Sequence, residues 1–180
     1  PAGEPTSCLV NTNYARTGAE GGGAGYLRFE RASELFRGLP EGPVDFRTIL
    51  STFSRDTGHV LVDQPTPFEL GGVPGDRELW ISTRDTINKA YTSAAVVLVG
   101  RTPGAAGSVA TMWVIPGEPV TAVAVPLWVE AGASPDEMWR GDEAPLWLES
   151  ARLKKLARPF AEGNKGDYLN LTVLDNAAGT

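Results

Sequence analysis

The sequence contains almost none of the side chains that bind metal ions or form disulfides. Cys8 and His59 are the only cysteine and the only histidine among its 180 residues. A single cysteine cannot form a disulfide within the chain, and one cysteine with one histidine needs several carboxylates to complete a zinc site. The sequence therefore excludes a disulfide scaffold and a Cys-x-x-Cys zinc site, and we expect no metal and no cofactor.

Long hydrophobic runs and an excess of positive charge are also missing. No stretch reaches the roughly 18 consecutive apolar residues that a membrane-spanning helix needs. The net charge is −6, and an acidic chain lacks the basic surface that attracts nucleic acid or an anionic membrane. We therefore expect neither a nucleic-acid partner nor a membrane span. Residues 1–7 lack the basic and apolar segments of a signal peptide, and we interpret them as a linker or a trimmed end.

The residues that are present predict an α+β domain with a mainly antiparallel sheet and helices packed on one face. Apolar side chains recur at helical spacing, while β-branched and aromatic residues gather in short runs separated by turn residues. Short connections between such runs favour antiparallel pairing. We interpret residues 1–180 as a single domain, with a core over 8–162 and a tail over 163–180 that holds a last short strand or turn. The spacing predicts helices over 26–36, over 46–56 and within 146–163, where Pro159 halts the helix. It predicts strands over 8–14, 79–83, 91–100, 108–117 and 120–132.

Three features near the start of the chain have a catalytic or binding interpretation and a simpler structural one. Pro1 has the position of a catalytic amine, but the loop-like residues 1–7 do not lead directly into an apolar strand. Cys8 lies inside an apolar strand pattern, which favours a buried and inert thiol. Only cleavage of the bond before Cys8 would let its own amine serve as its base. The glycine-rich loop 18–25 lacks a following Gly-Lys-Ser/Thr, which favours a flexible hinge over a phosphate loop.

His59, together with Ser54, Asp56 and Asp63, has the residue types of a catalytic triad. All four lie within ten residues of one another in a loop-rich stretch. Catalytic triads are assembled from elements that are distant in sequence. We therefore interpret His59 as an ordinary loop histidine.

Asn13 and Arg28 form a more specific pair. An asparagine at the end of a strand can direct its carboxamide N–H at a developing oxyanion. An arginine on the following helix can hold a carboxylate or a charged catalytic group through its planar guanidinium. On composition and spacing alone, a turn-capping asparagine and a solvated arginine are the simpler interpretation.

Three segments resemble a known group of enzymes: NTNYARTG…GYLRFERASELF, YTSAAVV and TMWVIPGEPVTAVAVPLWV. They are similar to the C-terminal half of the N-terminal-nucleophile (Ntn) hydrolases of the choloylglycine hydrolase, acid ceramidase and penicillin acyltransferase-like group. These enzymes cleave or transfer linear amide C–N bonds on a four-layer αββα sandwich. The resemblance implies that Asn13 stabilises the oxyanion and that Arg28, or failing it Arg31, orients the nucleophile or the polar end of the substrate. Tyr14 and Trp113 would be walls of the substrate pocket.

The sequence departs from that group in its nucleophile. The resemblance covers about residues 8–130, whereas the family places a nucleophilic Cys at a processed N-terminus of the first half, followed by an Arg and an Asp. The resemblance therefore implies the non-nucleophile part of an amidohydrolase or acyltransferase for a small-molecule amide, with the nucleophilic Cys on a partner chain. The alternative is a catalytically inactive structural or assembly subunit built on the same half-fold.

Both alternatives predict another protein chain as a partner. The apolar runs SAAVVLVG and VTAVAVPLWV are typical of strands that are buried on both faces. A half sandwich would leave one apolar sheet face in water, and large apolar patches are usually covered. Members of the resembled group are often exported, which favours a periplasmic or extracellular location.

Overall fold

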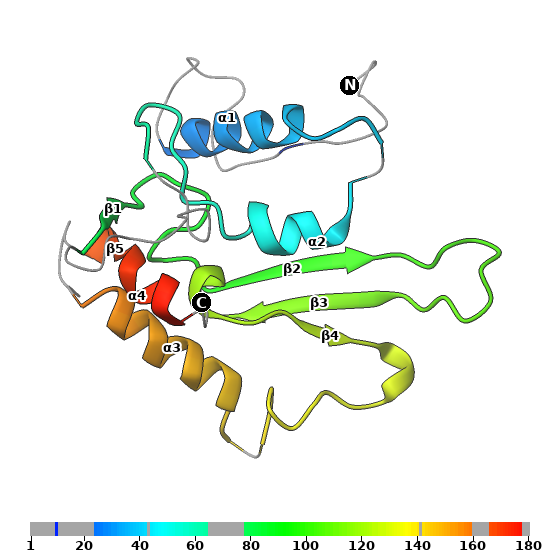
Figure 1. The fold of residues 1–180 in the computed structure, drawn as a ribbon. Helices are drawn as coiled ribbons and strands as arrows, with labels where there is room; N and C mark the ends of the chain where they lie inside the picture. The colour runs from blue at the N-terminus through cyan, green and yellow to red at the C-terminus, as the bar shows by residue number, and fades with distance from the viewer. Residues whose placement is uncertain are drawn as a thin grey trace.

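The computed structural model describes residue 10 and residues 24–42, 44–64, 78–140, 142–159 and 166–177. In these ranges the chain is a mixed α+β fold with two small antiparallel sheets, which confirms the predicted α+β class. Figure 1 shows the arrangement of the elements. The helices are α1 (Ala24–Arg37), α2 (Phe46–Thr48), η1 (Ile49–Phe53), η2 (Pro119–Thr121), η3 (Val129–Ala131), α3 (Pro145–Ala157) and α4 (Leu171–Ala177), and the strands are β1 (Trp80–Ser82), β2 (Ala94–Val99), β3 (Thr111–Pro116), β4 (Val125–Leu127) and β5 (Tyr168–Asn170).

The larger sheet has the strand order β2-β3-β4, and both of its pairings are antiparallel. Leu98 lies opposite Met112, and Met112 lies opposite Leu127. The turn between β2 and β3 contains Gly104 and Gly107, which both have positive φ angles that side chains with a Cβ rarely adopt. The predicted antiparallel pairing is thus confirmed, although the connections over 100–110 and 117–124 are longer than the tight turns expected.

One face of this sheet is covered by α2 and η1. The Asp45 side chain accepts a hydrogen bond from the backbone N–H of Arg47 and so caps α2. η1 continues the helix as one turn of π-helix. Its Leu50 side chain is buried with Ile115 of the sheet, and Phe46 and Trp113 pack against this cluster. The helical spacing of apolar residues over 46–53 therefore places a single apolar stripe on the sheet.

α1 forms a further layer on top of η1. The rings of Phe36 and Phe53 meet edge to face with 4.7 Å between their centroids. Figure 1 shows α2 between α1 and the larger sheet. α1 therefore contacts the sheet layer indirectly, through the side chains of η1.

The smaller sheet pairs β1 with β5, which are far apart in the sequence. Trp80 lies opposite Asn170, and Ile81 lies opposite Leu169. Ile81, Leu169 and Leu174 belong to a second buried cluster, which α3 completes through Ala157. The end of the chain thus includes a strand and a helix that pack into the core.

The opposite face of the larger sheet is partly open. Val96, Leu98 and Met112 are 53%, 75% and 39% exposed, and we call these three side chains the apolar face. Along β2 exposed and half-buried residues alternate. Within the described residues β2 is thus covered on one face only, and burial of its other face by a partner chain stays a prediction.

Candidate functional site

The structure separates the sequence-predicted site residues that it describes. Asn13 and Tyr14 lie outside the described residues, as do Pro1 and Cys8. Arg28 is on α1, where its side chain is half-buried and its Nη1 atom is fully buried. Trp113 is on β3, beneath α2 and η1. Because α2 lies between α1 and the sheet, Arg28 and Trp113 belong to different layers (Figure 1).

Trp113 forms part of a hollow between the sheet and the α2–η1 helix. The hollow has a volume of about 480 Å³. The rings of Phe46 and Trp113 stack with 5.4 Å between centroids and 21° between planes. The guanidinium of Arg47 lies 4.5 Å from the centre of the Phe46 ring. The residues that line the hollow are Phe46, Arg47, Leu50, Ser51, Arg55 and Trp113.

Arg55 brings positive charge to this hollow. Its guanidinium donates hydrogen bonds to the carbonyl oxygens of Leu50, at 3.3 Å, and of Ala122, at 2.9 Å. Burial lowers the pKa of Arg55, because the low-dielectric surroundings disfavour its charged form. None of the described residues that line the hollow is acidic. Aromatic walls with two arginines suit an apolar group that carries an electron-rich or anionic end.

Arg31, the second arginine that the resemblance suggests, is held in a bidentate ion pair. Its Nε and Nη2 atoms donate to the two carboxylate oxygens of Asp56, at 3.0 and 2.6 Å. The hydrogen bond to Asp56 is the main reason why the pKa of Arg31 is raised. A Cβ at Gly58 would lie 2.4 Å from the Arg31 Nη2 atom, so the missing side chain makes room for the guanidinium. This geometry ties α1 to the loop after η1.

His59 has a local role in the same loop. Its Nδ1 atom accepts a hydrogen bond from the backbone N–H of Leu61 at 3.0 Å. The Ser54 hydroxyl donates to the carbonyl of Leu50, and Asp56 is held by Arg31. These contacts fit a loop histidine, and they do not assemble a triad from Ser54, His59 and Asp56.

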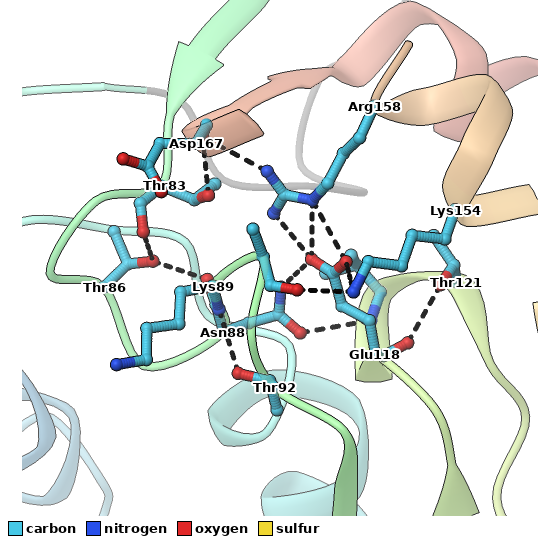
Figure 2. A network of polar contacts seen from close by, with 12 residues as sticks. Thr83, Thr86, Asn88, Lys89, Thr92, Glu118, Thr121, Lys154, Arg158 and Asp167 are labelled. Atoms are coloured by element: carbon cyan, nitrogen blue, oxygen red, sulfur yellow. Dashed lines mark hydrogen bonds and ion pairs between the residues drawn. The ribbon is translucent and has the colours of Figure 1, made fainter. Parts of the chain in front are cut away.

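The most buried charged cluster of the described residues centres on Glu118, which sequence reasoning missed. The Glu118 side chain is 0% exposed and that of Arg158 is 4% exposed. The Arg158 Nη2 atom donates to Glu118 Oε1 at 2.6 Å, and its Nε atom donates to Oε2 at 3.0 Å. Figure 2 shows how these side chains converge. The available signal was that Glu118 is the single charged residue of the apolar stretch 109–127.

Asn88 and Lys154 complete this cluster. The Asn88 Nδ2 atom donates to Glu118 Oε1 at 2.8 Å, and its Oδ1 atom accepts the backbone N–H of Val120 at 3.3 Å. The Lys154 Nζ atom lies 3.4 Å from Glu118 Oε2. Arg158 also donates to backbone carbonyls that lead into β5, including those of Asp167 and Tyr168. The cluster therefore joins α3, β5 and the turn before β2, which is a structural role (Figure 2).

Comparison with known proteins and a search for other site types add no assignment. No protein-family model matches the sequence, and neither a curated protein nor a solved structure matches it. Across the described ranges, no group of three or more His, Cys, Asp or Glu side chains is placed to hold a metal ion. Within the same part of the chain, no helix has the length and hydrophobicity that spanning a membrane requires.

Proposed function

We propose that this chain is the non-nucleophile half of an Ntn-type amidohydrolase or acyltransferase, which acts on linear amide C–N bonds together with a partner chain. The partner carries the N-terminal Cys and a second sheet, and the larger sheet of this chain is one inner layer of the resulting αββα sandwich. The α+β class and the antiparallel pairing of β2, β3 and β4 support this proposal.

The observation that carries the proposal is the apolar face of Val96, Leu98 and Met112. Leu98 and Met112 lie opposite each other on neighbouring strands, so their side chains share one face. Exposed apolar side chains that lie together on a sheet mark a surface that another protein covers. The other face is already covered by α2 and η1, so a sheet of the partner packs on this face.

In the proposed mechanism, the thiolate of the partner's N-terminal Cys attacks the amide carbonyl, and the α-amine of that Cys carries the proton to the leaving amine. Asn13 donates a hydrogen bond to the oxyanion of the tetrahedral intermediate. Arg28 holds the nucleophile or the polar end of the substrate in position.

Alanine substitutions in the purified complex test this proposal. We expect Asn13→Ala to lower kcat for the cleavage of chromogenic N-acyl anilides by roughly 100- to 1000-fold, because one oxyanion donor is lost. Arg28→Ala should also lower kcat/KM. Arg37→Ala is the matched control, because Arg37 is exposed in the last turn of the same helix and should leave the rate unchanged.

A complex that cleaves these amides equally well with Asn13→Ala and Arg28→Ala together would contradict the proposed roles. A stable complex with no amidase activity in the unsubstituted form would instead identify the chain as an assembly subunit. Both results need a folded complex, which circular dichroism and the native mass of each variant establish.

A further inference from the structure

The second surface of interest is the outer edge of β2. β2 is at the end of the strand order, and in the described part of the chain only β3 pairs with it. The backbone N–H of Gly117 donates to the carbonyl of Ser93 at 3.0 Å. This bond shows which residues of β2 exchange backbone hydrogen bonds with β3 and which point away from it. In an antiparallel pair every second residue exchanges hydrogen bonds with its partner strand. Ser93, Ala95, Val97 and Val99 therefore point their backbone groups toward β3.

The intervening residues Ala94, Val96 and Leu98 point their backbone N–H and C=O groups away from β3. Natural sheets usually protect such an edge with a charged side chain, a proline or a bulge. β2 has the sequence AAVVLV and pairs with β3 in unbroken register, so it has none of these three devices. Val96 and Leu98 are also 53% and 75% exposed, so the described part of the chain leaves both residues largely uncovered. The edge thus offers three donors and three acceptors in a regular row.

We propose that a second copy of this chain pairs with the β2 edge, antiparallel and across a twofold axis at Val96. A strand that pairs antiparallel with itself is self-complementary, as a twofold interface requires. In this register Val96 lies opposite Val96 of the other copy, and Ala94 lies opposite its Leu98. The outward backbone groups of these residues then hydrogen-bond with one another, and the two larger sheets become one continuous sheet.

The distribution of charge along the sequence favours a second copy of this chain as the partner of the β2 edge. Each copy carries a net charge of −6, so two copies repel each other overall. Residues 91–100, which contain β2, include no charged residue. This edge is therefore a place where two copies approach without a like-charge penalty from the contacting strands. The inference does not depend on the proposed function, because the edge uses backbone groups whereas the proposed sandwich partner uses the apolar face.

Sedimentation equilibrium of the purified chain alone tests the inference. We expect the chain to form a dimer of twice 19.1 kDa. Val96→Pro removes the central outward N–H and spares the N–H groups that bond to β3, so it should give a folded monomer. Val96→Ala is the matched control, because it shortens the same side chain but keeps the N–H, and it should remain a dimer. A dimer for both variants, or a monomer for the unsubstituted chain at its highest soluble concentration, would overturn the inference.

If Val96→Pro does not fold, hydrogen exchange of the unsubstituted chain tests whether the dimer forms through the β2 edge. The amides of Ala94, Val96 and Leu98 should exchange slowly at high protein concentration and faster on dilution, whereas the amides of Ala95 and Val97 should be protected at both. Fast exchange at Val96 in a dimeric sample would place the interface elsewhere and overturn the inference. If the chain does not dimerise, the proposed sandwich with a partner chain is not contradicted. If no Cys-bearing partner chain is found, the proposed dimer is not contradicted.

Discussion

At the scale of single residues, Glu118 shows how a buried charge organises this fold. Its carboxylate accepts hydrogen bonds from Arg158 and Asn88 and lies 3.4 Å from the Lys154 ammonium. A buried charge is expensive to desolvate and is tolerated only when its partners satisfy it. Removal of the Glu118 charge should therefore cost much more stability than the intact cluster contributes, because it leaves the charges of its partners without compensation.

Glu118→Gln should therefore be strongly destabilising. The neutral amide cannot balance the charges of Arg158 and Lys154, and breaking a buried pair from one side typically costs about 3–5 kcal/mol in the free energy of unfolding. Urea denaturation followed by circular dichroism measures this loss. Glu149→Gln is the matched control, because it makes the same chemical change in an ion pair with Arg152 whose two side chains are both 62% exposed. Equal stability losses for the two variants would show that burial does not set the strength of the Glu118 cluster.

At the scale of elements, the sequence predicts segments with a strong local pattern. The Asp45 cap and the apolar spacing after it correctly place the helix of α2 and η1, and the turn residues correctly place β2 and β3 next to each other. The sequence does not show that β1 pairs with β5, because this pairing is set by packing between residues about 90 positions apart and not by local propensity. Helix α4 was not predicted either. Its Leu171 and Leu174 are buried in the second core cluster, so the helix depends on long-range packing and not on a local pattern.

The turn at Gly117 joins two elements through a close contact. Gly117 has a φ angle of +112°, and a Cβ at this position would lie 2.2 Å from the Ser150 Oγ atom of α3. Only glycine combines this backbone conformation with room for the serine. The close approach of the end of β3 to α3 therefore depends on two separate properties of one residue.

Gly117→Ala should destabilise the fold through both properties. A residue with a Cβ in this backbone region costs about 1–3 kcal/mol in strain alone, and the clash with Ser150 adds to it. The double variant Gly117→Ala with Ser150→Gly removes the clash and keeps the strain, so its urea midpoint should recover only in part. A full recovery would assign the whole effect to the clash, and no loss in Gly117→Ala alone would contradict the account of this turn.

At the scale of the whole molecule, the sequence predicts a partner chain, and that partner stays a prediction. The apolar runs of β2 and β3 predicted burial on both faces, but in this chain Val96, Leu98 and Met112 remain exposed. Trp113 lines a hollow, and its role as a wall of a substrate pocket stays a prediction. The layer between Arg28 and Trp113 was not predictable, because stacking of α1 on η1 depends on tertiary contacts such as Phe36 with Phe53. The roles of Asn13 and Arg28 stay predictions.

The most direct test of the central claim is the composition of the native complex. The chain is purified from its source under non-denaturing conditions, its native mass is measured, and the N-terminal residue of every chain present is sequenced. The account predicts a stoichiometric second chain whose first residue is Cys and whose release from the complex abolishes amide cleavage. Material that contains this chain alone, or a partner without an N-terminal Cys, would contradict the claim that this protein is half of an amide-cleaving enzyme.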